Sequence, residues 1–167
     1  MSDATSSEGL WLKINIADQS LSLLRGKKLL EVFDISTASN GPGELFGSEC
    51  TPRGRHIIRA KIGEGCMLNT VFVARRPNGE IFTEALQQQH PERDWILTRI
   101  LWLSGCEPGI NRSGNVDTMR RYIYIHGCPD EIEMGVPASH GCIRMTNKEG
   151  VTFFELLPIG TDVLICE

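Results

Sequence analysis

The sequence predicts a mainly β protein of one domain, because short runs with strand periodicity alternate with turn residues along most of its length. In residues 10–16, apolar side chains alternate with polar or aromatic ones, which is the period of a half-buried strand. Residues 20–25 and 28–35 repeat this pattern after tight turns, so the first three strands should form an antiparallel meander. Only one segment carries a strong helix signal. We therefore expect a β-sandwich or barrel with one or two helices.

The middle of the chain alternates between loops and further strands. Residues 36–54 are rich in Gly, Ser and Pro and are expected to form a loop. Further strand patterns lie at residues 55–62, 69–75, 80–83, 121–126 and 161–166, with a turn at Pro77-Asn78-Gly79 before the third. Residues 95–103 fit a strand or a helical face. The whole stretch 84–118 is expected to form a lid-like excursion over one face.

One helix is predicted near the C-terminus. Thr146 and Glu149 have the spacing of a capping box, in which each side chain accepts from the other residue's backbone N–H. An apolar run over 151–157 follows, and Pro158 ends it. The helix should therefore begin just after the second of the two His-Gly-Cys triplets described below.

Length and charge exclude several classes of protein. The chain has 167 residues, 41% of them hydrophobic, which suits one domain with its own core. A net charge of -4 and the lack of a basic run argue against a nucleic-acid partner. The first twelve residues contain acidic and hydroxyl side chains, unlike a signal peptide, and no window approaches the roughly 18 apolar residues of a membrane span. We expect a flexible N-terminus over residues 1–9 and a cytoplasmic location, or a periplasmic one if a leader has been removed.

The six cysteines contain no C-x-x-C pair. Without a leader we interpret them as reduced thiols, most of them packed as small hydrophobic side chains. Two lie in near-identical triplets, His126-Gly127-Cys128 and His140-Gly141-Cys142, only fourteen positions apart. These triplets are the strongest candidates for chemistry in the chain.

One interpretation makes Cys142 a nucleophile. A thiol reacts readily once an adjacent base removes its proton, and histidine titrates near neutrality, so His126 is the candidate base. The carbonyl of Gly127 could orient that ring. The nearby helix start is expected to lower the thiol's pKa, and the N–H groups of Gly141 and Cys142 are candidates for binding an oxyanion.

Two other interpretations use the same residues. His126, Cys128, His140 and Cys142 form a Cys2His2 set that zinc would accept, although the H-x-C spacing differs from that of common zinc modules. Alternatively, the histidines are ordinary and the cysteines are packing residues. The residues alone leave these three interpretations open.

The segment 126–147, H-G-x-P…G-x-x-x-S-H-G-C-I-R-M-x-N, resembles the catalytic signature of the YkuD-type L,D-transpeptidases. Upstream, Thr51-Pro52-x-Gly54 resembles the family's T-P-x-G element, and the opening strands with Gln19 at the turn match its usual start. The resemblance spans nearly the whole chain. It implies a YkuD-like β-sandwich catalytic domain over residues 10–167, chemistry on peptidoglycan stem peptides, and no cofactor or metal.

The resemblance also implies roles for individual residues. Cys142 would attack the carbonyl of the third stem residue, usually diaminopimelate, and release D-alanine to leave a thioester. His126 would act as base, oriented by Gly127, while Ser139, His140 and Arg144 would shape the site and bind substrate. An amine acceptor gives L,D-transpeptidase activity and water gives L,D-carboxypeptidase activity. Hydrolysis of free muropeptides is favoured for a chain with no visible leader, and carbapenem-type inhibitors should acylate the thiol.

One departure from the family pattern is Cys128, where the family commonly has threonine. This thiol could fill space or form a reversible disulfide with Cys142. The arginines at 112, 120 and 121 are candidates for contact with a substrate carboxylate, or are solvated surface residues. A non-catalytic muropeptide-binding module is the further alternative to an enzyme.

Overall fold

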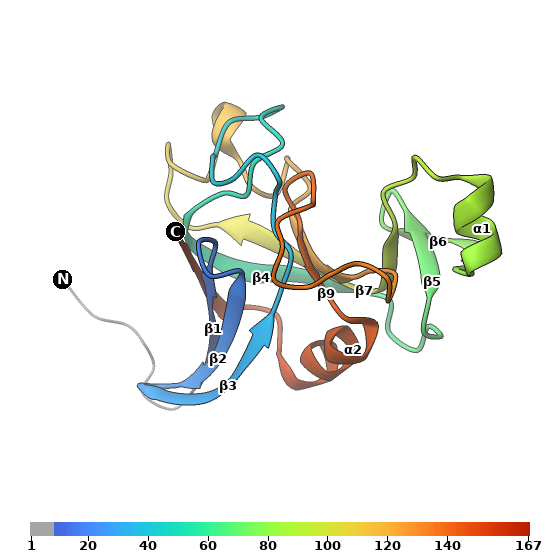
Figure 1. Cartoon of the computed structure of the whole chain (residues 1–167). Coiled ribbons are helices and arrows are strands. Elements are labelled where there is room, and N and C mark those ends of the chain that lie inside the picture. Colours follow the sequence, from blue (N-terminus) through green and yellow to red (C-terminus); the bar gives the residue numbers. More distant parts are fainter. Residues whose placement is uncertain (1–8) are drawn as a thin grey trace.

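The computed structural model describes residues 9–167, so the N-terminus predicted to be flexible lies outside the described residues apart from Gly9. Figure 1 shows the fold, and residues 9–167 contain ten strands, two α-helices and one 3-10 turn. The strands are β1 (Leu10–Asn15), β2 (Ser20–Arg25), β3 (Lys28–Asp34), β4 (Gly54–Ile62), β5 (Thr70–Val73), β6 (Arg76–Ile81), β7 (Ile96–Gly105), β8 (Tyr124–Gly127), β9 (Ile143–Met145) and β10 (Asp162–Cys166). The helices are α1 (Glu84–Gln89) and α2 (Asn147–Leu156), and the 3-10 turn is η1 (Gly114–Val116).

All ten strands belong to one mixed sheet. Its main path runs β3-β2-β1-β10-β4-β7-β5-β6, and β8 and β9 branch from β7. Pairing is antiparallel except between β1 and β10 and between β8 and β9. The prediction of a mainly β fold with one or two helices is confirmed. The sheet curls so that β1–β3 face α2 across the core (Figure 1).

The predicted meander is present in β1, β2 and β3. Leu12 pairs with Leu23 and Ile14 with Leu21, and all four side chains are buried. The alternation of apolar residues therefore points one face of these strands into the core. Parallel pairing of β1 with β10 joins the two ends of the domain, a long-range contact that the local pattern does not indicate.

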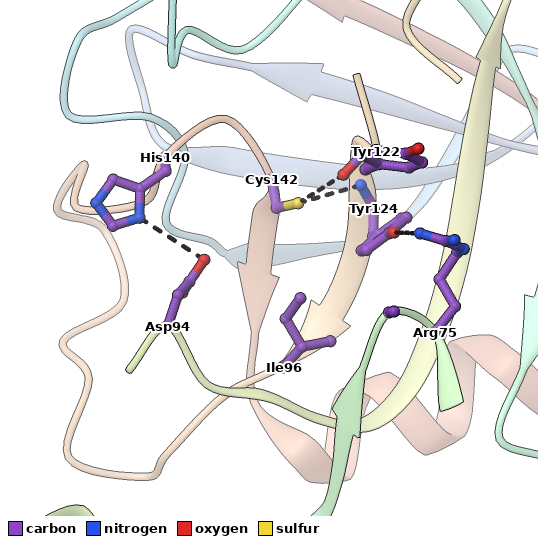
Figure 2. Close-up of a pocket in the computed structure, with 8 residues that line it drawn as sticks. Arg75, Asp94, Ile96, Tyr122, Tyr124, His140 and Cys142 are labelled. Atoms are coloured by element: carbon purple, nitrogen blue, oxygen red, sulfur yellow. Dashed lines mark hydrogen bonds and ion pairs between the residues drawn. The ribbon is translucent and has the colours of Figure 1, made fainter. Parts of the chain in front are cut away.

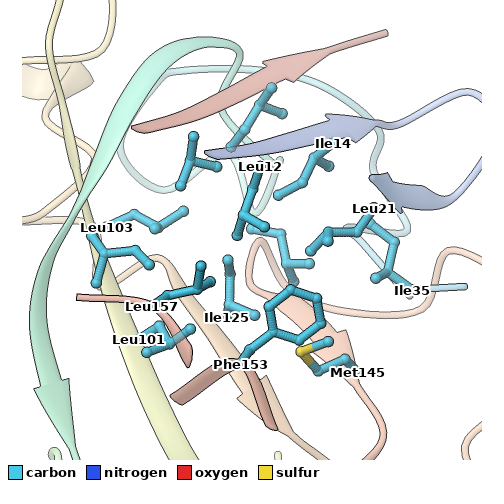
Figure 3. Close-up of a cluster of buried hydrophobic side chains, with 14 of the residues drawn as sticks. Leu12, Ile14, Leu21, Ile35, Leu101, Leu103, Ile125, Met145, Phe153 and Leu157 are labelled. Carbon is cyan, nitrogen blue, oxygen red and sulfur yellow. The ribbon is translucent and has the colours of Figure 1, made fainter. Parts of the chain in front are cut away.

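The main core lies between the curled sheet and α2 (Figure 3). Phe153 of α2 is fully buried there, and its ring meets that of Phe33 edge-on at a centroid distance of 4.9 Å. The apolar face of α2 thus closes the sheet from the side opposite the pocket described below.

We predict that Phe153→Ala lowers the free energy of unfolding by about 3–5 kcal/mol, because it removes a large buried ring and leaves a cavity. Urea unfolding followed by circular dichroism measures the change. The matched control is Leu156→Ala on the same helix, where the side chain is 44% exposed and the loss should stay below about 1 kcal/mol. Equal losses in both variants would contradict this description of the core.

The lid-like excursion predicted for 84–118 needs correction. Its centre is β7, a strand that pairs with β4, β5 and β8 and lies in the middle of the sheet. Apart from Thr98 and Arg99, residues 96–103 are apolar on both faces because both faces are covered, and such a run resembles a helical face in sequence. Of residues 84–118, only α1, η1 and the loops on either side of β7 lie outside the sheet.

The turn between β5 and β6 also differs from expectation. It falls at Ala74-Arg75, which have φ angles of 47° and 64°, rather than at residues 77–79. A two-residue turn with both φ positive normally uses Asn-Gly, so the sequence carries no turn signal here. Non-glycine residues in this region cost roughly 1–2 kcal/mol each.

The predicted capping box is confirmed at the start of α2. Thr146 Oγ1 accepts from the Glu149 N–H at 3.3 Å, and the Glu149 carboxylate accepts from the Thr146 N–H at 3.3 Å. The helix consequently begins at Asn147, directly after β9. Within residues 9–167, no helix has both the length and the apolar character to cross a membrane.

Candidate active site

Cys142 lies in a tight loop that contains the second His-Gly-Cys triplet and ends just before β9. Ser139 Oγ donates to the Cys142 carbonyl at 2.6 Å and accepts from the Gly141 N–H at 3.2 Å. Thr51 Oγ1, from the T-P-x-G element, donates to the Gly141 carbonyl at 2.9 Å. Gly141 has a φ of 131°, and a Cβ there would lie 3.1 Å from the carbonyl oxygen of Cys50, so only glycine fits without strain.

The half-buried sulfur of Cys142 lies between two tyrosines that follow each other closely in sequence. The Tyr124 N–H donates to the sulfur at 3.3 Å, and the thiol donates to the Tyr122 carbonyl at 3.3 Å (Figure 2). Tyr122 has a φ of 57°, an unusual value for a bulky residue, and this conformation holds its carbonyl against the thiol.

Burial raises the pKa of the Cys142 thiol to about 12, although the backbone N–H of Tyr124 favours the thiolate. The prediction that a helix start lowers this pKa is therefore wrong. Strand β9 separates Cys142 from α2, so the cysteine does not lie in the first turn of the helix. The resting thiol is protonated at neutral pH.

His126 is buried at the end of β8, with 1% of its surface exposed. Its Nδ1 lies 2.6 Å from the Gly127 carbonyl oxygen, and because a carbonyl only accepts, the ring hydrogen is on Nδ1. Nε2 is buried and has no hydrogen-bond partner among the described residues. Burial lowers the pKa of His126, and the negative charge of Asp94 only partly opposes this, so the ring is neutral at pH 7.

The register of β8 against β9 places these two groups on one face. Ile125 pairs with Ile143, and both side chains are buried in the core. Their neighbours Tyr124, His126 and Cys142 therefore point to the opposite face. His126 is two residues, or roughly 7 Å, along the strand from Tyr124, whose N–H contacts the sulfur. His126 Nε2 and the Cys142 sulfur form no hydrogen bond with each other in the described residues.

Close packing fixes the Gly127 carbonyl that orients His126. A Cβ at position 127 would clash with Asn147 Oδ1 and would lie 2.7 Å from the Leu97 carbonyl oxygen. Asn147 is itself held by Thr98 Oγ1, which donates to its Oδ1 at 2.6 Å, and its Nδ2 donates to Asn69 Oδ1 at 2.9 Å. This polar network spans four segments of the chain and holds the Gly127 carbonyl that orients His126.

Asp94 is a member of the site that sequence reasoning missed. Its Oδ1 accepts from Arg144 Nη2 at 2.8 Å, and its Oδ2 lies 3.6 Å from His140 Nδ1 (Figure 2). Burial alone would raise the pKa of Asp94, but the charge of His126 in its protonated form and the hydrogen bond and charge of Arg144 lower it overall. A single acidic residue in a loop carries no motif, so only the folded arrangement identifies it.

Cys142 lines a pocket with a volume of about 440 Å³. Its lining residues are Ala74, Arg75, Asp94, Ile96, Tyr122, Tyr124, His140 and Cys142. In Figure 2, Cys142 lies between an end formed by Asp94 and His140 and an end formed by Arg75 and Tyr124. A peptide bound across this pocket would therefore pass the thiol.

Two predicted substrate-binding residues have other roles. Ser139 and Arg144 are buried and do not line the pocket. The Ser139 hydroxyl is engaged within the loop, and Arg144 is engaged by Asp94 and by the Ala138 carbonyl at 3.2 Å. Their polar groups already have partners, so the structure assigns these residues contacts that hold the loop. His140 is exposed and does line the pocket.

The structure does not assemble the predicted zinc ligands. Across residues 9–167 no group of three or more His, Cys, Asp or Glu side chains is arranged to hold a metal. Cys128 is buried and donates to the Met145 carbonyl at 3.4 Å. Cys128 directly follows β8 and lies four residues, or roughly 13 Å, from Tyr124, whose N–H contacts the Cys142 sulfur. A disulfide allows a Cα separation of only about 7 Å, so Cys128 is too far from Cys142 to form one. Both thiols are free, and Cys128 fills space.

The three arginines predicted as possible contacts for a substrate carboxylate do not line the pocket. Arg121 donates to the carbonyls of Gly43 and Cys50 and to Ser48 Oγ, so it anchors the loop before β4. Arg112 and Arg120 are exposed and do not line the pocket. The arginine that lines the pocket is Arg75, which the sequence did not suggest.

A family model described as the L,D-transpeptidase catalytic domain, YkuD, matches residues 9–165. This chain belongs to that family. YqjB of Bacillus subtilis (strain 168), whose name assigns it provisionally to the L,D-transpeptidases, is 49% identical over 43 residues, which cover 26% of this chain and 24% of YqjB.

Solved L,D-transpeptidases share the fold. The enzyme from Xylanimonas cellulosilytica DSM 15894 is 19% identical with a TM-score of 0.60, and the match covers 99% of this chain and 64% of that one. L,D-transpeptidase 3 from Mycobacterium tuberculosis, with a faropenem-derived adduct, is 15% identical with a TM-score of 0.57 over 95% of this chain and 60% of that one. This chain therefore spans less than two thirds of either protein.

The raised thiol pKa gives a direct test of the resting state. Because burial raises the pKa of Cys142 to about 12 and lowers that of His126, this chain should carry a neutral thiol and a neutral imidazole from pH 7 to 9. We expect the ultraviolet absorbance of the thiolate, taken as native protein minus Cys142→Ser, to show no titration step in that range. The control is the corresponding difference spectrum of native protein minus Cys50→Ser. A step centred below pH 8 in the Cys142 difference would mean a preformed thiolate–imidazolium pair.

Proposed function

We propose that this chain catalyses cysteine-dependent acyl transfer at the L,D peptide bond between the third residue and the terminal D-alanine of peptidoglycan stem tetrapeptides. The observation that carries the proposal is the buried His126, whose Nδ1 is bound to Gly127 and whose Nε2 is left unpartnered on the strand face that also holds Cys142. A buried ring nitrogen with a free lone pair, on the same strand face as a thiol, can act as a general base toward that thiol.

The first half-reaction forms a thioester. His126 Nε2 accepts the thiol proton as the sulfur attacks the carbonyl carbon of the third residue, and the carbonyl oxygen becomes an oxyanion. The Cys142 N–H is the proposed oxyanion donor. The Gly141 N–H joins it only if Ser139 Oγ releases it, since the two are bonded at 3.2 Å. As the C–N bond breaks, the imidazolium gives its proton to the departing amine of D-alanine.

The lowered pKa of His126 suits this proton transfer. A buried imidazolium is a stronger acid than an exposed one, so it readily protonates the leaving amine. The neutral resting pair also keeps the thiol from reacting until a peptide carbonyl is in place. In the second half-reaction, His126 accepts a proton from water or from an amine that attacks the thioester, and the thiol is regenerated.

Product analysis tests the proposal and separates the two outcomes. Purified protein is mixed with a disaccharide tetrapeptide, with and without D-methionine, and the products are identified by mass. A tripeptide in both mixtures identifies an L,D-carboxypeptidase, and a D-methionine-containing tetrapeptide identifies a transferase. Unchanged substrate in both mixtures would contradict the proposed function.

A β-lactam gives an independent readout of the nucleophile. Solved relatives include a complex with imipenem and a faropenem-derived adduct. We predict that imipenem adds its mass to this chain once, and that peptide mapping places the adduct on Cys142. The adduct should persist in Cys128→Ala, because the Cys128 thiol is buried and donates a hydrogen bond to the Met145 carbonyl. A chain that binds imipenem but forms no adduct would be a binding module, not an enzyme.

A further inference from the structure

One end of the pocket is formed by an arginine that the proposed mechanism does not use. Arg75 lies in the two-residue turn between β5 and β6, and both turn residues have left-handed backbone conformations. A turn of this kind points its side chains away from the hairpin axis, and here the Arg75 side chain reaches the pocket (Figure 2). The strained turn therefore delivers one cationic side chain to the site.

Three aromatic residues hold the guanidinium. Its central carbon lies 4.6 Å from the centroid of the Tyr122 ring and 4.8 Å from that of Trp102. Arg75 Nη1 donates to Tyr124 Oη at 3.1 Å. Cation–π contacts and one hydrogen bond fix the plane of the guanidinium and leave most of its five N–H donors unused.

Arg75 differs in this respect from other arginines of the chain. Arg53, Arg93 and Arg144 each form an ion pair with a carboxylate, at 2.8, 2.6 and 2.8 Å. No carboxylate within residues 9–167 lies within ion-pair distance of Arg75. A guanidinium held over two aromatic rings, at a pocket and lacking an internal counter-ion, is suited to bind a carboxylate through two parallel hydrogen bonds.

The same tyrosines connect this cation to the nucleophile. Tyr124 contacts the Cys142 sulfur through its backbone N–H and Arg75 through its hydroxyl, so one tyrosine spans the gap between them. Tyr122 contacts the thiol through its carbonyl and Arg75 through its ring. A carboxylate within about one residue of the reacting carbonyl would therefore fall at the Arg75 end of the pocket.

We propose that Arg75 is a specificity-determining residue that binds a carboxylate of the donor peptide beside the scissile bond. This inference rests on the proposed function. Two groups carry that chemistry: the C-terminal carboxylate of the leaving D-residue and the side-chain carboxylate of a diaminopimelate at the third position. The opposite end of the pocket contains Asp94, whose negative charge disfavours a carboxylate there.

The test compares substrates within each protein variant. Three tetrapeptides are used: the free acid, the C-terminal amide of the leaving residue, and the amide of the third residue's side chain. We expect one of the two amides to lower kcat/KM of the native chain by about 10- to 100-fold, since it removes a charge-assisted hydrogen-bond pair. In Arg75→Gln the same amide should react about as well as the free acid. The ratio between substrates does not depend on how much of the variant folds.

The matched control is Arg93→Gln. The Arg93 guanidinium also lies over a tryptophan, 5.0 Å from the Trp95 ring, but it is paired with Glu80 and does not line the pocket. This variant should keep the native discrimination between acid and amide. Arg75→Lys should retain part of it, because the charge remains while the planar fork is lost.

The outcomes separate the two proposals. A penalty on the C-terminal amide identifies the leaving residue's carboxylate, and a penalty on the side-chain amide identifies that of the third residue. If the native chain turns over all three peptides equally, or if Arg75→Gln keeps the native ratio, the role of Arg75 is refuted while the function stands. If the native chain turns over none and imipenem forms no adduct on Cys142, both proposals fail together.

Discussion

Replacing Cys142 by alanine should reduce turnover of a stem tetrapeptide by at least ~10³-fold, because the variant has no atom that can form the thioester. The side chain is half-buried and its sulfur makes two weak contacts with Tyr122 and Tyr124, so alanine should leave the fold intact. Release of D-alanine under single-turnover conditions measures the loss, and thermal unfolding checks the fold.

The matched variant is Cys128→Ala, which removes the cysteine of the other His-Gly-Cys triplet. Its thiol is buried and contacts only the Met145 carbonyl, so turnover per folded molecule should stay within a few-fold of the native value. If Cys142→Ala retained native turnover, the proposed nucleophile would be wrong. Loss of turnover in both variants, with stoichiometric zinc in the native protein alone, would instead revive the metal hypothesis.

Replacing His126 by glutamine should lower kcat/KM by about 10²- to 10⁴-fold, the usual range for removal of a general base. Glutamine is neutral and can still donate an N–H toward Gly127, but it offers no basic nitrogen to the thiol. Acylation by imipenem should slow to a similar degree, because it requires the same proton transfer. The matched control is His90→Gln, since His90 is exposed at the end of α1 and does not line the pocket.

The pH dependence of stability provides a second readout for His126. Its pKa is lowered in the folded chain, so below a pH of about 6.5 the unfolded chain binds a proton that the folded chain does not. Native stability should therefore fall as the pH drops below that value. His126→Gln should lose less stability over the same interval, as urea unfolding at pH 7 and pH 5 would measure. A variant that loses stability in parallel with the native chain would argue that the ring is not buried and neutral.

Local patterns in the sequence were sufficient to predict many of the strands and the capped helix. Alternation in residues 10–16 and 20–25 depends only on which face of a strand meets the core, and the capping box of Thr146 and Glu149 closes within three residues. The candidate thiol and imidazole were visible for the same reason, because Cys142 and His126 each belong to a short His-Gly-Cys triplet in the sequence. Each of these signals involves neighbours along the chain.

The parts that only the tertiary structure decided involve residues far apart in sequence. Asp94 meets Arg144 across 50 positions and Arg75 meets Tyr124 across 49, and no local pattern encodes either contact. The central place of β7 depended on which strands covered its two faces, and the high pKa of Cys142 depended on burial by segments outside its own loop. Chemical identity is a property of residues in sequence, whereas burial, charge environment and counter-ions arise from long-range packing. The sequence by itself therefore determined the candidate reacting groups, and the fold decided their ionisation and what surrounds them.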